Sequence, residues 1–479
     1  MTPLSGVAMR AIVITACAAA LLSSAAVLAQ KTSVVPQPRA NALPAPAAAR
    51  PNVSRVVPRP DSAMPRVPDG FVVTSYAELQ APRMMVYAPN GDLFVSSPAA
   101  NNITVLRDAN NDGVFEMRSV FAQGPPPPGR GQAPAAAPAR PGGAGGQGGG
   151  ARAAAPPQGP GRGAPPPPEV LGANAPACMP PENFVRRGPG SLQSPFGLAF
   201  NDGYLYVGNT GSIVRYKYSN GDLQAQGEPE QLLEMPTGGH STRNILFNRA
   251  GTKMYIAVGS RSNNDAGEDC RRAAILEFNP DGSGFRVYAS GIRNPVGLAL
   301  QPGTDTIWTA MNERDNLGDD LVPDYATSVK DGGFYGWPYS YIGSNYDPRY
   351  IGSFPDLVKR AIVPDVLFPA HSAALGITFY TGTQFPQRYR NGAFVALHGS
   401  WNRSVASGYK VVFFPMNNGK PGPIEDFFGG FLSTTGEDSS QIEVWGRPVG
   451  VTVARDGALL VSDDAGNRIW KVSAGRPSR

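Results

Sequence analysis

Short runs of alternating apolar residues recur along the chain in pairs, and the two runs of a pair are separated by a turn that contains glycine. The turns that open the second run of each pair begin at Asn90, Asp202, Gly251, Gly303, Asn391 and Asp456. The preceding run is typified by Phe196-Gly197-Leu198-Ala199-Phe200. Two such runs around a glycine turn predict a β-hairpin. Hairpins repeated about every 50 residues predict propeller blades. We therefore expect an all-β, six-bladed β-propeller over residues 67–474.

Three segments lie outside this pattern. Residues 1–29 combine Arg10, an Ala-rich apolar run and the small-residue site Val27-Leu28-Ala29, which predicts a cleaved signal peptide rather than a membrane anchor, and so a periplasmic or secreted protein. Residues 30–66 are rich in Pro and Ala and predict a disordered leader. Residues 124–168 form a low-complexity insertion between the first and second repeats, which we expect to be a disordered surface loop.

Composition narrows the classes of partner. The chain has 57 Gly and 49 Pro among 479 residues, as suits a turn-rich β-protein, and its formal net charge is only +5. Because no basic stripe with interleaved aromatic residues is present, we expect no nucleic-acid partner. No second apolar run approaches spanning length, so we expect no stable membrane insertion after cleavage. The mature chain would keep Cys178 and Cys270, which can form a disulfide in an exported protein or remain separate thiols.

The segment from Asp108 to Gly113 follows the start of a calcium-binding loop. Position twelve of that pattern is Ser119 instead of Glu, which argues against an EF-hand. A hairpin turn is the favoured interpretation, and a structural calcium site is the alternative.

The three histidines of the chain each lie beside a predicted strand end. His240 and His371 precede a first strand, and His398 follows a second strand. In a propeller the ends of the inner strands open onto one mouth, so we expect the three side chains to converge there. Unrelated structural histidines, or a zinc site, are the alternatives.

Four arginines occupy similar places. Arg243, Arg293 and Arg447 each precede the first strand of a hairpin, and Arg403 follows a second strand. Cations gathered around one mouth repel each other unless an anion lies among them. A ligand with several carboxylates would pair with them through bidentate contacts, whereas a surface ion pair is the alternative for any one arginine.

The longest connection between repeats contains the acidic stretch 312–320, followed by Trp337-Pro338. Carboxylates and backbone carbonyls in an irregular loop are the hard oxygen ligands that calcium prefers, although a solvated acidic turn would look the same. Trp337 would either cover a flat bound molecule or pack between blades.

The ordered set of these motifs resembles the glucose/sorbosone dehydrogenase family, and is most similar to its sorbosone dehydrogenase branch. The matching phrases begin at Gly238, Gly291, Asn312, Tyr335, His398 and Gly446. The resemblance implies a six-bladed propeller that binds pyrroloquinoline quinone flat over its mouth, with a calcium ion at the quinone. The chain departs from the glucose-type enzymes at Gly239, where they carry Asp, and in the spacing from His240 to Arg243, which is one residue shorter. The His398–Arg403 phrase replaces their cofactor-pairing lysine.

The resemblance implies a role for individual residues. His240 matches the catalytic base, and Arg293 is placed with it at the reacting centre. The implied metal ligands are the backbone carbonyls of Asp315 and Asn316. The implied cofactor-binding residues are Arg243, Arg293, Asn294, Trp337, His398, Arg403 and Arg447. The implied substrate-binding residues are Gln193, His371 and Trp401.

We therefore expect a dehydrogenase that oxidises a sugar, a sugar aldehyde or a related alcohol by hydride transfer to the quinone, and then passes electrons to an external acceptor. Two alternatives remain. One is a non-catalytic propeller that binds a carbohydrate or a protein at the same mouth. The other is a calcium-dependent lactone hydrolase.

Overall fold

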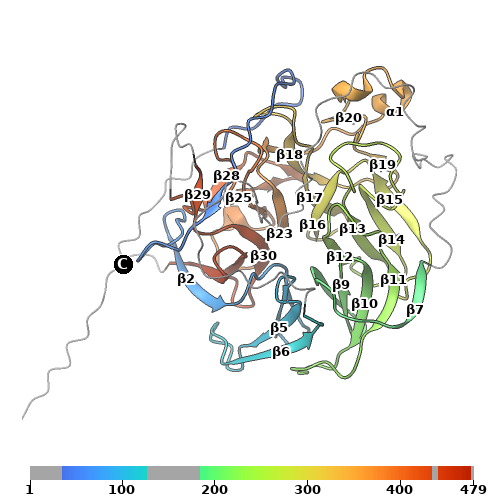
Figure 1. Ribbon diagram of the computed structural model, residues 1–479. Helices are drawn as coiled ribbons and strands as arrows, with labels where there is room; N and C mark the ends of the chain where they lie inside the picture. Colours follow the sequence, from blue (N-terminus) through green and yellow to red (C-terminus); the bar gives the residue numbers. More distant parts are fainter. Residues whose placement is uncertain (1–34, 127–183, 434–440, 476–479) are drawn as a thin grey trace, which may run out of the picture.

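The computed structural model describes residues 35–126, 184–433 and 441–475. Antiparallel sheets stand around a central axis as the blades of a six-bladed β-propeller, which confirms the expected fold (Figure 1). The first blade consists of β3 (Met85–Tyr87), β4 (Leu93–Ser97), β5 (Asn102–Arg107) and β6 (Met117–Gln123). The second consists of β8 (Gly197–Asn201), β9 (Tyr204–Gly208), β10 (Ser212–Lys217) and β11 (Glu230–Glu234), with β7 (Val185–Pro189) paired to β11 at the outer edge.

The remaining blades follow in chain order. The third consists of β12 (Arg243–Phe247), β13 (Met254–Val258), β14 (Ala274–Phe278), β15 (Arg286–Ser290) and the parallel strand β19 (Gly333–Phe334). The fourth consists of β16 (Asn294–Leu300), β17 (Ile307–Asn312), β18 (Pro323–Ser328) and β22 (Val366–Ala370). The fifth consists of β23 (Ala374–Phe379), β24 (Ala393–Leu397), β25 (Lys410–Phe414) and β28 (Glu425–Phe428). The sixth consists of β30 (Pro448–Val453), β31 (Leu459–Asp463), β32 (Arg468–Ala474) and β2 (Phe71–Glu78).

Minor elements decorate the connections. The paired short strands are β1 (Arg55–Val56) with β29 (Glu443–Val444), β20 (Ser340–Tyr341) with β21 (Asn345–Tyr346), and β26 (Met416–Asn417) with β27 (Lys420–Pro421). The helical turns are η1 (Pro348–Tyr350), α1 (Pro355–Lys359) and η2 (Gln387–Tyr389). Between β18 and β22, the connection that contains β20, β21, η1 and α1 projects beside the third blade (Figure 1).

The ring is closed by the two ends of the described chain. Strand β2 pairs antiparallel with β32, in a register that joins Phe71 to Ala474 and Glu78 to Arg468. The sixth blade therefore takes three strands from the end of the chain and its outer strand from the beginning.

Glycines on the inner strands explain why the apolar phrases repeat. A Cβ placed on Gly297 would lie 2.3 Å from the backbone oxygen of Leu375 in the next blade. The same approach recurs from Gly197 to the carbonyl of Arg243 at 2.4 Å, from Gly376 to that of Val449 at 2.5 Å, and from Gly450 to that of Arg83 at 2.3 Å. Because only hydrogen fits there, glycine lets neighbouring inner strands close around the axis.

The leader differs from the expected disorder along residues 35–66. Val35 is buried and its N–H donates to the carbonyl of Ile424. The N–H of Ala47 donates to the carbonyl of Leu317, and β1 adds to β29. Composition predicts disorder because the segment offers few apolar side chains, but its backbone groups find partners on the propeller instead.

Several of the sequence-based predictions concern residues that the structure does not describe. The signal peptide 1–29, residues 30–34, Cys178 and most of the insertion 124–168 lie outside the described residues. Cys270 takes part in a disulfide. Among the described residues, no helix is both long and apolar enough to cross a membrane.

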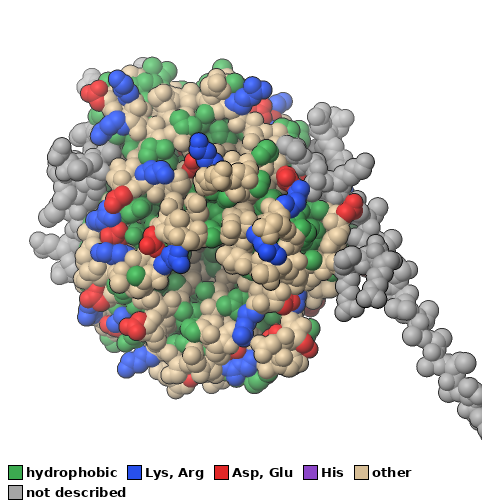
Figure 2. Space-filling view, turned by 180° about the vertical axis from the view of Figure 1, so that it is seen from behind, with side chains coloured by type: hydrophobic (Ala, Val, Ile, Leu, Met, Phe, Trp, Pro, Cys, Tyr) green, Lys and Arg blue, Asp and Glu red, His purple; other side chains and the backbone are tan. Residues whose placement is uncertain are grey.

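The segment from Asp108 to Gly113 forms the turn between β5 and β6, as expected for a hairpin. Carboxylate oxygens of Asp108, Asp112 and Glu116 lie within 4.8 Å of one another there. The calcium alternative for this turn stays a prediction. On the face turned away in Figure 1, basic and acidic side chains are interspersed and do not gather by sign (Figure 2).

Candidate functional site

His240 lies in the connection that leads into β12. Its Nδ1 lies 2.8 Å from the carbonyl oxygen of Ser260, and its backbone N–H donates to the same oxygen at 3.0 Å. A carbonyl can only accept, so Nδ1 carries the proton and Nε2 keeps its lone pair. Within the described part of the chain, Nε2 makes no hydrogen bond. Burial, followed by the charge of Arg293, lowers the pKa of His240 to about 3, so the ring is neutral at pH 7.

Arg293 lies just before β16 with its side chain buried. Its Nε donates to the carbonyl of Asn263 at 2.9 Å, and Nη1 donates to that of Glu313 at 2.6 Å. Nη2 donates to Oδ1 of Asn263 at 2.9 Å and lies 3.3 Å from a carboxylate oxygen of Asp315. The guanidinium is therefore committed to the chain's own acceptors, and it fixes the loop after β17 relative to β16.

His371 and Asp315 form a pair beneath that loop. Nδ1 of His371 lies 3.3 Å from Oδ1 of Asp315, and Nε2 lies 2.9 Å from the carbonyl of Gly318. Burial acts to lower the pKa of His371, but the hydrogen bond and charge of Asp315 raise it overall. Burial acts to raise the pKa of Asp315, but His371 and Arg293 lower it overall. The Asp315 carboxylate thus already contacts Arg293 and His371, which leaves its backbone carbonyl as the oxygen ligand that it can offer a metal.

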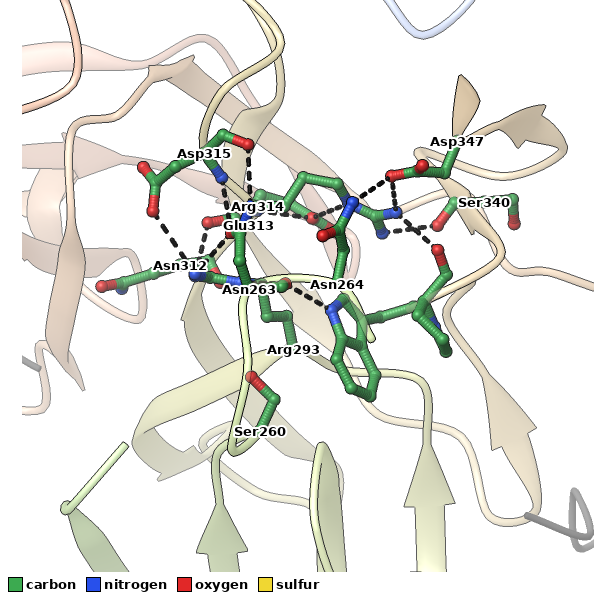
Figure 3. A network of polar contacts seen from close by, with 12 residues as sticks. Ser260, Asn263, Asn264, Arg293, Asn312, Glu313, Arg314, Asp315, Ser340 and Asp347 are labelled. Atoms are coloured by element: carbon green, nitrogen blue, oxygen red, sulfur yellow. Dashed lines mark hydrogen bonds and ion pairs between the residues drawn. The ribbon is translucent and has the colours of Figure 1, made fainter. Parts of the chain in front are cut away.

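Asn263, which the sequence analysis did not single out, makes hydrogen bonds to both Arg293 and Asp315 (Figure 3). It lies in the connection after β13, three residues beyond Ser260. Its carbonyl also accepts a hydrogen bond from Nε1 of Trp337 at 2.9 Å. Trp337 is 5% exposed, so it packs into this network and does not stand free over the mouth. A single asparagine carries no sequence pattern, so no signal in this chain could have singled it out.

A buried ion-pair network supports the same loop from the other side. The side chain of Arg314 is fully buried, with Nε 3.0 Å from Glu313 and Nη1 3.0 Å from Asp347. Its Nη2 donates to the carbonyl of Ser340 at 2.7 Å (Figure 3). Because these charges are paired and hydrogen-bonded, they fix the course of residues 312–315.

A second cluster joins three blades at the ring closure. Nε2 of His398 lies 2.9 Å from Oδ1 of Asp464, and Arg83 pairs with the other carboxylate oxygen of Asp464 at 3.1 Å. Arg447 donates from Nε to the carbonyl of His398 at 3.0 Å and from Nη2 to that of Gly399 at 3.0 Å. Burial, followed by Arg447, lowers the pKa of His398 to about 4. Asp464 follows β31 at a strand end, and that position was the signal that could have found it.

The other expected residues lie apart from these contacts. Arg243 is buried and donates to the carbonyls of Pro236, His240 and Thr242, so it shapes the His240 connection. Arg403 pairs with Asp320 at 2.9 Å and donates to the carbonyl of Asp319. The side chain of Gln193 donates to Ser191, and the carbonyl of Trp401 accepts from the N–H of Asn52. The structure thus brings His240, Arg293, Asp315, Trp337 and His371 into one network, and His398 with Arg447 into another.

The site retains polar capacity that a ligand would satisfy. Among the described residues, Oδ1 of Asn294, Nε of Arg83 and both amide atoms of Asn402 are buried without a hydrogen-bond partner. Such atoms cost free energy unless a ligand or water meets them. The carbonyl of Asn316 accepts no hydrogen bond in the described chain, and Asn316 has a φ of 72°. Spare cationic donors and a free carbonyl fit a polyanionic organic cofactor held with a calcium ion.

Comparison with known proteins identifies the family of the chain. The model of the glucose/sorbosone dehydrogenase family matches residues 206–402, and a TrAA12-like model matches residues 358–475. An uncharacterized protein of Borreliella burgdorferi is 30% identical over 299 residues, which cover 59% of this chain and 76% of that protein. The chain belongs to the glucose/sorbosone dehydrogenase family.

Other family relatives are more distant. The pyrroloquinoline quinone-dependent pyranose dehydrogenase of Coprinopsis cinerea is 26% identical over 328 residues, which cover 56% of this chain but only 44% of that enzyme. Its PQQ domain in the holo form aligns with a TM-score of 0.60 at 19% identity, over 87% of this chain and 98% of that domain. A calcium structure of the Trichoderma reesei AA12 enzyme aligns with a TM-score of 0.62 at 17% identity, over 86% and 97% of the chains. At these identities the two structures establish the shared fold.

Proposed function

We propose that this chain is an exported quinoprotein dehydrogenase that oxidises a sugar, a sugar aldehyde such as sorbosone, or a related alcohol. The observation that carries the proposal is His240, a neutral histidine beside the buried charge of Arg293. Ser260 fixes its Nδ1, and its Nε2 makes no hydrogen bond to any described residue. A base in this state removes a hydroxyl proton without first having to lose its own. The family relationship and the pyrroloquinoline quinone named for the C. cinerea relative support the choice of cofactor.

The residues divide the binding tasks. Arg83, whose Nε has no hydrogen-bond partner among the described residues, and Arg447 would face the carboxylates of pyrroloquinoline quinone, and the carbonyls of Asp315 and Asn316 would hold calcium. When bound, pyrroloquinoline quinone supplies the acceptor for the hydride that leaves the substrate carbon. His240 takes the substrate hydroxyl proton at Nε2, and Ser260 keeps the ring oriented as it does so. Arg293 adds positive charge next to the base and disfavours the imidazolium.

The function is tested by reconstitution. Mature protein is titrated with pyrroloquinoline quinone and Ca²⁺, and dye reduction is followed with a panel of aldoses, sugar aldehydes and simple alcohols. We expect saturable quinone binding and turnover on at least one sugar class. Binding of a sugar without binding of the quinone would favour a non-catalytic receptor, and calcium-dependent cleavage of a lactone would favour the hydrolase.

The assignment of the base is tested separately. His240→Ala should lower kcat at least ~100-fold, the usual scale for loss of a general base, while quinone binding stays intact. Full turnover by the loaded variant would remove His240 from the mechanism.

Export is tested on the natural chain. N-terminal sequencing of protein recovered outside the cytoplasm should begin at Gln30, after the predicted cleavage site. Recovery of the uncleaved chain in the cytoplasm would contradict this part of the proposal.

A further inference from the structure

Asn263 bridges the backbone N–H and the backbone carbonyl of Asp315, a residue of the proposed metal-binding loop. Its Nδ2 donates to the carbonyl oxygen of Asp315 at 3.0 Å, and its Oδ1 accepts from the N–H of Asp315 at 2.9 Å. The same Oδ1 accepts from Nη2 of Arg293 at 2.9 Å. One amide side chain therefore sets the position of Asp315 and, through it, the direction of the carbonyl that precedes Asn316 (Figure 3).

The chemistry of the position calls for an amide. The amide of asparagine carries a donor and an acceptor on the same carbon, so one side chain can contact both the N–H and the C=O of a single residue. Aspartate would keep the acceptor contacts to Arg293 and to the Asp315 N–H, but it would set an oxygen against the Asp315 carbonyl. Alanine would remove all three contacts and leave two buried groups to find new partners.

The segment that carries Asn263 is itself held firmly. Carboxylate oxygens of Glu268 accept from the N–H groups of Arg261 and Ser262, each at 2.6 Å. Ser260, at the start of the same segment, holds Nδ1 of His240. A displacement at residue 263 is thus passed to the Asp315 carbonyl, and Ser260, which orients the proposed base, lies only three residues away.

We propose that Asn263 is a positioning residue for the metal site, which aims the carbonyl of Asp315 at a divalent cation and keeps Arg293 beside it. The inference rests on the proposed function, because it takes the Asp315 and Asn316 carbonyls as calcium ligands. Groups that orient metal ligands typically contribute about 10- to 100-fold to metal affinity. Asn263 therefore sets calcium affinity through Asp315 without binding the ion itself.

The neighbouring Asn264 provides a matched control. Its Nδ2 donates to Asp347 at 3.0 Å and its Oδ1 accepts from Arg349 at 2.6 Å, so it ties the loop to the opposite network (Figure 3). It has no hydrogen bond to Asp315. Replacing either asparagine by alanine removes buried hydrogen bonds, but only Asn263→Ala frees the proposed metal carbonyl.

The test is calorimetric titration of the full mature protein with Ca²⁺, with and without pyrroloquinoline quinone, together with thermal unfolding in each state. Asn263→Ala should weaken calcium binding about 10- to 100-fold and lose most of the calcium-induced rise in Tm. Asn264→Ala should lower Tm without calcium but keep the wild-type calcium affinity. Asn263→Asp, which retains the acceptor contacts that the fold uses, should also bind calcium more weakly.

The possible results distinguish the proposed calcium site from the proposed role of Asn263. If wild-type protein binds no calcium, the metal part of the proposed function fails. If wild-type protein binds calcium and Asn263→Ala binds it equally well, the positioning role alone is overturned. Tighter calcium binding by Asn263→Asp than by wild type would make residue 263 a direct ligand, which also overturns the positioning role.

Discussion

Nδ1 of His240 and the carbonyl oxygen of Ser260 lie 2.8 Å apart, and this contact fixes which nitrogen of the base is free. The acceptor is a backbone oxygen, so it cannot release the ring by changing its own protonation state. The orientation of the base is therefore built into the connection between β13 and β14, a different part of the third blade from the strand that His240 precedes.

The pH dependence of catalysis follows from this environment. Burial and then Arg293 lower the pKa of His240 to about 3, and a base works above its pKa. We expect kcat/KM to be independent of His240 protonation from pH 8 down to about 4, and to fall only as the pH approaches 3. A pH–rate profile of the reconstituted enzyme measures this. An acid limb near 6.5, absent in His240→Gln, would show that the base is an ordinary exposed histidine.

Asp324 links stability to pH. Its buried carboxylate accepts from the N–H groups of Glu313 and Ala373, and burial raises its pKa to about 7. Between about pH 4 and pH 7 the folded state binds more protons at this group than the unfolded state, so its contribution to stability falls as the pH rises. In Asp324→Asn that contribution disappears, and urea unfolding at a series of pH values should give a flatter profile. Parallel profiles for the two proteins would contradict the assignment.

The inner-strand glycines give a prediction about the ring itself. In Gly297→Ala the new Cβ would meet the backbone of Leu375 in the next blade, where no flexible side chain can yield. We expect a loss of about 1–3 kcal/mol in the free energy of unfolding, the scale of overpacking. Gly188→Ala is the matched control, since no atom lies within 4 Å of its added Cβ. Denaturant titrations that give both variants the same stability would refute the close-approach argument.

The docking of the leader can be tested at one hydrogen bond. Ala47→Pro removes the N–H that donates to Leu317, whereas Ala48→Pro places the same ring next to it without removing a bond from the described network. Loss of one hydrogen bond of about 1 kcal/mol should raise the rate of trypsin cleavage after Arg39 about fivefold. Equal cleavage of the two variants and of wild type would show that this contact does not hold the leader.

The sequence predicted the blades because their signals are local. Alternation of apolar residues and turn glycines, such as Gly203 with a φ of 72°, belongs to each hairpin alone and repeats in every blade. The docking of the leader had no such signal, since backbone N–H groups look alike in every sequence. The hydrogen bonds that Arg293 donates to the carbonyls of Asn263 and Glu313 depend on how the chain folds, and the spacing of residues along the sequence does not predict them.

The candidate site was predicted in part for the same reason. His240, Arg293 and His371 stand at strand ends, where a propeller gathers its connections. Asp315 joins Arg293 to His371, and Ser260 holds the ring of His240 beside them. Asn263 escaped notice because a lone amide acquires meaning only from its partners, whereas Asp464 directly follows the end of β31, a position that could have singled it out.

Ring closure has a consequence for how the molecule is made. The leader and β2 leave the ribosome before any blade, but their partners at Ile442, Val444 and β32 are among the last described residues to be synthesised. Domains generally begin to fold from the N-terminus during synthesis, and this chain must hold its first strand unpaired until its last one arrives. A nascent chain that stops before β29 therefore has a partner neither for β1 nor for β2.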